Sequence, residues 1–199
     1  MSEPTKSVRP QPGDALIVVD VQRDFLPGGN LGVPHGDEVV PVLNRYLAAF
    51  HARALPVYAT RDWHPSNHCS FQARGGPWPP HCIAETPGAA FAAKLQLPPQ
   101  TVVISKAQGA DQDAYSGFEG TDLDAQLKRA GVRRVFVGGL ATDYCVLNTV
   151  RDARRLGYGV YLLADGVRAV NVKPDDGPRA EDEMRRLGAT PIEFEQIVA

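Results

Sequence analysis

The stretch Arg134-Val-Phe-Val-Gly-Gly-Leu-Ala-Thr-Asp-Tyr-Cys145 places a cysteine just beyond a predicted strand and in the first turn of a predicted helix. Its apolar start is typical of a strand, and the glycine pair that follows ends the run. Thr142 or Asp143 can cap the helix. The helix then carries an apolar stripe made of Val146, Leu147, Val150, Ala153 and Leu156.

The position of Cys145 makes it a candidate nucleophile. At the start of a helix, unpaired backbone amides and the positive end of the helix dipole favour a thiolate over a thiol. The same amides can donate hydrogen bonds to an oxyanion. The alternative is a small, buried apolar side chain, which is the commoner fate of a cysteine. This stretch taken alone leaves both interpretations open.

Length and composition predict one ordinary globular domain. The 199 residues are 43% hydrophobic and 22% charged, which is enough apolar material for one core. We expect a flexible N-terminal segment over residues 1–13 and a single domain over residues 14–199. A net charge of -2 favours neither a nucleic acid nor an anionic membrane as a partner, so a small molecule is the expected ligand.

The chain also carries no predicted targeting or membrane segment. Its first residues lack the apolar core of a signal peptide, and no later run approaches the length of a membrane-spanning helix. A cytoplasmic location is therefore expected. Cys69, Cys82 and Cys145 are too few for a disulfide framework, and free thiols or metal ligands are expected instead.

Strands and helices alternate along the chain. Apolar runs predict strands at residues 15–20, 56–60, 101–105, 135–137, 159–163 and 190–194. Helical spacing of apolar residues predicts further helices at residues 37–54, 122–130 and 177–187. The alternation implies an α/β fold, a single-domain three-layer sandwich with a mostly parallel six-stranded sheet and helices on both faces.

Polar side chains follow four of these strands. Asp20, Asp62 with His64, Lys106 and Cys145 each come at or just after a strand's carboxyl end. Because parallel strands end at the same edge of a sheet, and such folds bind ligands there, these groups are expected to converge. A carboxylate, a metal-ligand pair, an ammonium and a thiol on one edge indicate an active site.

The chemistry of a cysteine nucleophile can be assigned to named groups. Lys106 can lower the pKa of the Cys145 thiol, and Asp20 can accept its proton and pass it to a departing amine. The backbone amides of Ala141 and Cys145 can form an oxyanion hole. The alternative, in which Asp20 and Lys106 are only a buried ion pair, leaves Cys145 unexplained.

A metal site is also predicted. Residues 65–88 show no periodicity, and so long a loop inside a compact domain is usually functional. Asp62, His64 and His81 are ligands suited to zinc, manganese or iron, and one carboxylate with two imidazoles leaves positions open for water and substrate.

A competing set of ligands is present in the same loop. Two His-Cys pairs, His68 with Cys69 and His81 with Cys82, can close a structural zinc site. This set ranks lower because it leaves the ligands at the end of the second strand unused. His68 is left out of the predicted metal set, and the alternative for it is hydrogen bonding within the loop.

Several segments together resemble nicotinamidases, also called pyrazinamidases, of the isochorismatase-like cysteine hydrolase superfamily, and the resemblance runs nearly end to end. The matching segments are Asp20-Val-Gln-Arg-Asp-Phe25, Gly28-Gly-Asn-Leu31, Arg61-Asp-Trp-His-Pro-Ser-Asn-His-Cys-Ser-Phe71, Trp78-Pro-Pro-His-Cys82, Lys106, Tyr115-Ser-Gly-Phe118 and Gly138-Gly-Leu-Ala-Thr-Asp-Tyr-Cys-Val146. One departure is Lys106-Ala-Gln-Gly109, where many members place a glycine directly after the lysine. It concerns the geometry of the loop and not the lysine.

The resemblance implies the roles of the site residues. It implies that Asp20, Lys106 and Cys145 are catalytic and that Asp62, His64 and His81 bind one divalent metal ion, zinc in the first place. It also implies a non-proline cis peptide at Leu140-Ala141 that presents the oxyanion-hole amides. The residues it implies around the pyridine ring of the substrate are Phe25, Leu31, Trp78, Tyr115 and Ala141, for which core packing is the alternative.

The implied activity is hydrolysis of nicotinamide, and of pyrazinamide, to the acid and ammonia through a cysteine thioester, in NAD salvage. A metal-free relative that hydrolyses isochorismate or a carbamoyl compound is one alternative. A non-enzymatic zinc-binding or thiol-redox module is another, and the absence of a Cys-x-x-Cys pair argues against it. Homo-oligomerisation is left open.

Overall fold

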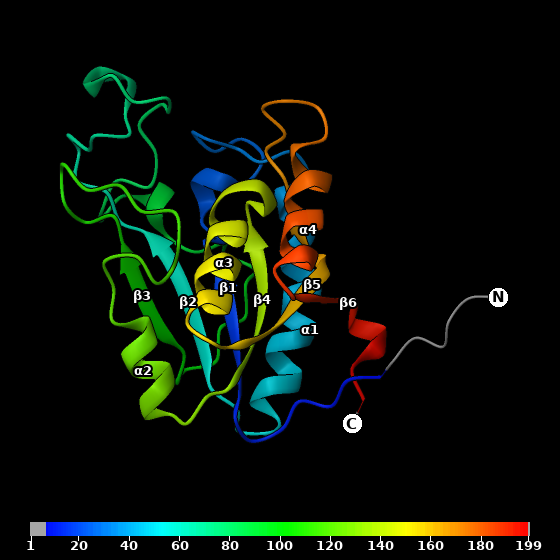
Figure 1. Ribbon diagram of the computed structural model, residues 1–199. Helices are drawn as coiled ribbons and strands as arrows, with labels where there is room; N and C mark the ends of the chain where they lie inside the picture. The colour runs from blue at the N-terminus through cyan, green and yellow to red at the C-terminus, as the bar shows by residue number, and fades with distance from the viewer. Residues whose placement is uncertain (1–6, 199) are drawn as a thin grey trace.

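One parallel sheet forms the centre of the protein, as seen in the computed structural model, which describes residues 7–198 (Figure 1). Its strand order is β3-β2-β1-β4-β5-β6, and each neighbouring pair is parallel. The strands are β1 (Asp14–Val19), β2 (Val57–Asp62), β3 (Val102–Lys106), β4 (Arg134–Leu140), β5 (Gly159–Arg168) and β6 (Thr190–Ile192). The α-helices are α1 (Val39–His51), α2 (Leu123–Arg129), α3 (Leu147–Arg155) and α4 (Asp176–Arg186). The predicted α/β sandwich is confirmed.

The central strand β1 is buried on both faces, and its side chains alternate between two cores. Leu16 and Val18 pack in the core that contains the apolar face of α1. Ile17 and Val19 pack in the core that contains the apolar residues of α2, α3 and α4. Because each fully buried aliphatic side chain contributes about 1.5–3 kcal/mol, this continuous apolar run fixes β1 at the middle of the sheet.

The strand β5 is longer than the sequence predicted. The predicted strand ends at Leu163, before Ala164 and Asp165, whereas β5 continues to Arg168 after a shift in its register with β4. The interrupting Asp165 is satisfied within the fold, because its carboxylate accepts hydrogen bonds from Tyr46 Oη and Phe194 N, both at 3.0 Å. The strand therefore tolerates a charged residue and carries the chain further toward the carboxyl edge.

The helix that follows β4 begins differently from the prediction. Thr142–Val146 forms a π-helical turn, and the regular helix α3 begins only at Leu147. Cys145 lies in this wider turn, directly beyond the sheet. The predicted helix at residues 37–54 is α1 with a separate 3₁₀ turn, Gly36–Glu38, before it.

Part of the predicted N-terminal segment lies outside the described residues, namely residues 1–6. In the described part, Val8 is buried and pairs with the C-terminal end of the chain. Its N–H donates to Gln196 O at 2.8 Å, and its carbonyl accepts from Val198 N at 3.1 Å. Over the described range, none of the helices is both long enough and apolar enough to cross a membrane.

A glycine in β4 allows β1 and β4 to approach closely. Gly139 has φ +127°, and a Cβ there would lie 2.1 Å from Val19 O of the neighbouring strand. We expect Gly139→Ala to lower the free energy of unfolding by about 3–5 kcal/mol, measured by urea denaturation.

Gly131→Ala is the matched control, because Gly131 also has a positive φ, +68°, but no atom within 4 Å of its added Cβ. Gly131→Ala should lower the free energy of unfolding by only about 1–2 kcal/mol. Equal losses for the two variants would show that backbone conformation, and not strand contact, makes glycine necessary at position 139.

Candidate active site

The carboxyl ends of four strands bring an ammonium, two carboxylates and a thiol into contact. Lys106 Nζ, at the end of β3, lies 2.9 Å from Asp20 Oδ2 and 3.5 Å from Cys145 Sγ, and it also pairs with Asp62 Oδ1. It donates a further hydrogen bond to Ala114 O at 3.1 Å. The structure therefore brings together the side chains that were predicted to converge.

The position of Asp20 follows from a sharp turn after β1. Its backbone is left-handed, with φ 48°, and its side chain is completely buried. Thr60 Oγ1 in β2 donates to Asp20 Oδ1 at 2.6 Å, which leaves Oδ2 directed at Lys106. The carboxylate is therefore held from two neighbouring strands.

The residue after the lysine also has a left-handed backbone. Ala107 has φ 52°, a conformation that glycine adopts at little cost. This accounts for the glycine that many resembling proteins place there. Alanine keeps the same turn, and Lys106 still reaches the other three groups.

Burial has the largest effect on the pKa of the Cys145 thiol. Burial raises the pKa of the Cys145 thiol well above its ordinary value, and Lys106 opposes this only in part. Burial also raises the pKa of Asp20, again against the effect of Lys106. Burial acts to lower the pKa of Lys106, but the carboxylates of Asp20 and Asp62 outweigh it and keep the pKa well above its ordinary value. Burial therefore opposes the thiolate that the helix position favours, and a nearby base can assist by taking the proton.

The turn that carries Cys145 has an unusual backbone. The peptide between Leu140 and Ala141 is cis, which confirms the prediction from the family resemblance. Ala141 O accepts hydrogen bonds from the N–H groups of Tyr144 and Val146, both at 3.1 Å. These are the residues directly before and after Cys145. The turn packs in the core at Val146 and presents Cys145 to the pocket.

Asp62, His64 and His81 form a group whose ligand atoms all lie within 4.8 Å of one another. His64 Nδ1 lies 3.2 Å from Ala107 O, and His81 Nδ1 lies 2.8 Å from Pro79 O. Carbonyl oxygens only accept, so both Nδ1 atoms carry the hydrogen and both Nε2 atoms are free to bind a metal. These Nε2 atoms lie 3.4 and 4.0 Å from Asp62 Oδ2.

This geometry fits a divalent cation. Within residues 7–198, His64 Nε2 is a buried nitrogen without a hydrogen-bond partner, which a metal ion would satisfy. Burial acts to raise the pKa of Asp62, but Lys106 and His64 lower it below its ordinary value, so this ligand is charged. Three protein ligands leave room for water and substrate, as in catalytic metal sites.

Gln22 and Asp24, in the loop after β1, hold the candidate metal ligands in place. Gln22 Nε2 donates to Asp62 O and Gln22 Oε1 accepts from Asp62 N, both at 2.8 Å. Asp24 Oδ2 accepts from the N–H of Cys82, the neighbour of His81, at 2.7 Å. The sequence analysis did not assign these roles, although two polar residues so close to a buried strand were a signal.

His68 is not available as a ligand in this arrangement. Its Nδ1 lies 2.7 Å from Ser70 Oγ, and its Nε2 lies 3.0 Å from Gln112 O. Its ring stacks on His64 with centroids 4.1 Å apart. Among the described residues, the set of two His-Cys pairs does not converge. The other convergent group, Asp20 with Asp62 and Cys145, already surrounds Lys106.

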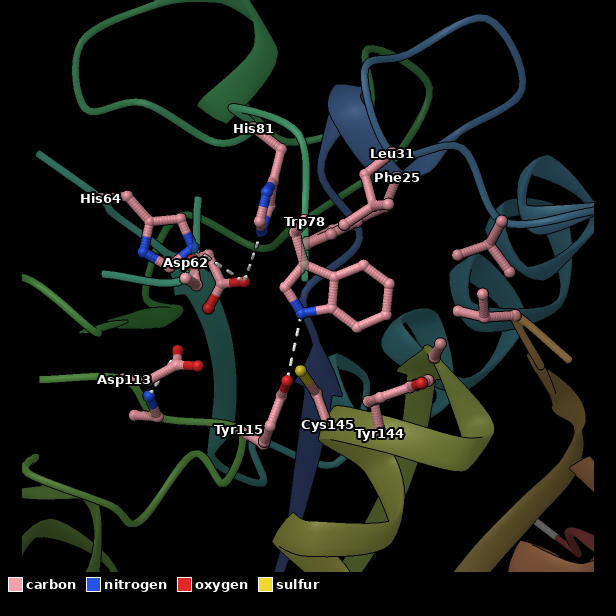
Figure 2. A pocket seen from close by; sticks show the side chains of 15 residues that line it. Phe25, Leu31, Asp62, His64, Trp78, His81, Asp113, Tyr115, Tyr144 and Cys145 are labelled. Carbon is pink, nitrogen blue, oxygen red and sulfur yellow. Dashed lines mark hydrogen bonds and ion pairs between the residues drawn. The ribbon is translucent and has the colours of Figure 1, made fainter. Parts of the chain in front are cut away.

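Cys145 and the group of Asp62, His64 and His81 line one pocket, whereas Asp20 and Lys106 lie behind its surface. The pocket has an empty volume of about 480 Å³, including its mouth, which is suited to a small molecule. The residues predicted around the ring all line it, namely Phe25, Leu31, Trp78, Tyr115 and Ala141. Figure 2 shows the metal-ligand group on one side and the aromatic side chains beside Cys145 on the other. Residues missed from the sequence also line it: Val33, Ser70, Asp113, Ala114, Tyr144 and Val170.

Three aromatic side chains, two from loops and one from the π-helical turn, form one wall of the pocket (Figure 2). Trp78 Nε1 donates to Tyr115 Oη at 3.1 Å, and the ring of Tyr144 lies edge to face with Trp78 at 5.2 Å. Tyr115 and Tyr144 are 5.6 Å apart. A flat aromatic ligand is well suited to such a wall.

Comparison with protein families shows to which family the chain belongs. Residues 14–196 match the model of the isochorismatase domain. The chain belongs to the isochorismatase family. This isochorismatase-family chain is 39% identical over 200 residues to the nicotinamidase of Escherichia coli (strain K12), covering 90% of this chain and 94% of that protein.

Solved structures of similar proteins share the fold of this isochorismatase-family chain. The pyrazinamidase of Pyrococcus horikoshii, crystallised in complex with zinc, is 52% identical with a TM-score of 0.88, covering 92% of this chain and 100% of that one. PnC1 from L. infantum, in complex with nicotinate, is 38% identical with a TM-score of 0.87, covering 94% and 96%.

A metal-binding experiment tests the histidine group. We expect the metal-free protein to bind one equivalent of Zn²⁺ in calorimetry, and His64→Ala or His81→Ala to weaken this by about 100-fold or more. His68→Gln should keep one equivalent, because its ring nitrogens already have protein partners. Loss of zinc in the His68 variant together with full binding by the His81 variant would contradict the assignment.

Proposed function

We propose that this protein is a nicotinamidase, which hydrolyses nicotinamide, and also pyrazinamide, to the acid and ammonia in NAD salvage. The observation that carries the proposal is the contact of Lys106 Nζ with Asp20 at 2.9 Å and Cys145 at 3.5 Å, beside a pocket that also holds a metal-ligand group. The similarity to proteins named nicotinamidase and pyrazinamidase supports it.

The substrate ring would occupy the aromatic side of the pocket. Phe25, Leu31, Trp78 and Tyr115 offer apolar surface to both faces and the edge of a six-membered ring. The carboxamide would then point to Cys145 and to the amide groups of the turn before it. Asp62, His64 and His81 would hold the metal, proposed to be zinc with iron or manganese as alternatives, which when bound supplies a point of attachment that orients the substrate.

The first half of the reaction forms a thioester. Cys145 Sγ gives its proton to Asp20 and attacks the carboxamide carbon, so a C–S bond forms and the carbonyl electrons move onto oxygen. The backbone N–H groups of Ala141 and Cys145 donate to this oxyanion. When the C=O bond re-forms, the C–N bond breaks, and Asp20 returns the proton to the departing nitrogen, which leaves as ammonia.

The second half consumes one water. Asp20 takes a proton from the water as its oxygen attacks the thioester carbon. The C–S bond then breaks, the proton returns to Cys145, and nicotinic acid is released. Lys106 keeps its positive charge throughout, and it stabilises whichever of Asp20 and Cys145 is negative at each stage.

The free cysteines support the proposed cellular setting. Within the described chain, Cys69, Cys82 and Cys145 are all free thiols. Free thiols are typical of a reducing compartment, which supports a cytoplasmic location. A small-molecule substrate needs no macromolecular partner for this reaction.

Removal of the sulfur tests the function. Wild-type protein with zinc is expected to release ammonia from nicotinamide, and Cys145→Ala should lower kcat by about 10³-fold or more because no thioester can form. Cys69→Ala is the matched control and should retain activity, since Cys69 does not line the pocket. Absence of ammonia from wild-type protein at millimolar nicotinamide would refute the proposal, and turnover of isochorismate instead would favour the metal-free alternative.

A further inference from the structure

The loop between β5 and α4 forms one rim of the pocket. It rises above the carboxyl edge of the sheet as the orange segment before α4 in Figure 1. Val170 lines the pocket, whereas the residues after it are exposed, with Val172 at 61% exposure. The loop thus has one residue turned toward the substrate and little packing of its own beyond it.

The loop is tied to the nucleophile turn by one carboxylate. Asp143 Oδ1 accepts from Val170 N at 2.9 Å, and Asp143 Oδ2 accepts from Asn171 N at 2.8 Å. Hydrogen bonds to an ionised acceptor are roughly twice as strong as neutral ones. The two oxygens of one side chain therefore bind two successive backbone amides. This fixes both the direction of the loop and its distance from Asp143.

The other end of the same loop is fixed to α4. Asn171 Oδ1 accepts from Gly177 N at 2.8 Å. A Cβ at Gly177 would lie 2.7 Å from Ala169 Cβ, so the loop and the start of α4 are in close contact. Position 171 is thus held between the nucleophile turn and α4, with a left-handed backbone of φ 53°.

Asp143 belongs to the π-helical turn that carries Cys145, two residues later. Val170 and Cys145 line the same pocket. The two hydrogen bonds therefore set the distance between the Val170 side of the pocket and the sulfur that attacks the carboxamide of the substrate. We propose that Asp143 is a positioning residue that holds the Val170 side of the pocket against the nucleophile turn. This inference rests on the proposed function.

The effect should fall on substrate binding and not on the reactivity of the sulfur. Without the Asp143 carboxylate, the loop has more conformations and the ring is less confined, so binding must order the loop each time. The acid, the ammonium and the thiol make no contact through Asp143, since Lys106 joins them directly.

The experiment measures nicotinamide hydrolysis by the zinc-loaded full-length protein. Asp143→Ala should raise KM about tenfold, equivalent to about 1.4 kcal/mol, with kcat within about twofold of wild type. Asp143→Asn keeps one acceptor oxygen and should give an intermediate KM. Alkylation of Cys145 by iodoacetamide does not depend on how the pocket confines a substrate ring, so its rate should not change.

Asp176→Ala is the matched control. Asp176 also accepts a backbone N–H of this loop, that of Lys173 at 2.8 Å, but it is not part of the nucleophile turn. Its KM should stay within about twofold of wild type, because the link to Cys145 remains.

If Asp143→Ala does not fold, Asp143→Asn and Val170→Ala decide the matter. Each should raise KM. The double variant should raise KM no more than the stronger single variant, because both changes act on the Val170 side of the pocket. An unchanged KM, additive effects, or a slower reaction with iodoacetamide would overturn the inference. Wild-type protein that releases no ammonia would instead refute the proposed function itself.

Discussion

A buried lysine is the constraint on which the site depends. An ammonium that is removed from water is stable only if opposite charges surround it, and Lys106, fully buried, has Asp20 and Asp62 beside it. Asp62 serves two groups at once, because Oδ1 pairs with Lys106 while Oδ2 faces His64 and His81. One carboxylate therefore joins the nucleophile centre to the metal-ligand group. Asp20, Asp62 and Lys106 together carry one net negative charge, which a cation at that group would more than offset.

The parallel sheet is what makes such a cluster possible. Neighbouring parallel strands end at one edge, and the register that pairs Asp62 with Lys106 brings their side chains together before any loop is considered. The left-handed residues Asp20 and Ala107 then turn the chain sharply at two of these ends. Asp20 thereby points back across the edge instead of following its strand outward.

The sequence could predict the residues whose position is local to a strand end. Asp20, Asp62, Lys106 and Cys145 needed only the strand pattern and the rule that ligands bind at the carboxyl edge. Val170 and Tyr144 could not be placed in this way, since a register shift in β5 and the width of a π-helical turn decide where they lie. Both features depend on tertiary packing and leave no simple periodicity.

The pKa of the Cys145 thiol also could not be predicted from the sequence, and it has a consequence for the mechanism. A helix start and a nearby ammonium favour a thiolate, yet burial of the sulfur has the larger effect and raises the pKa of Cys145. Enclosure raises the pKa of Asp20 as well. Two groups with raised pKa values beside a fixed ammonium can exchange one proton without involving solvent. In the proposed reaction that single proton passes from sulfur to carboxylate to leaving group, so the net charge of the buried cluster stays constant while the amide bond is broken.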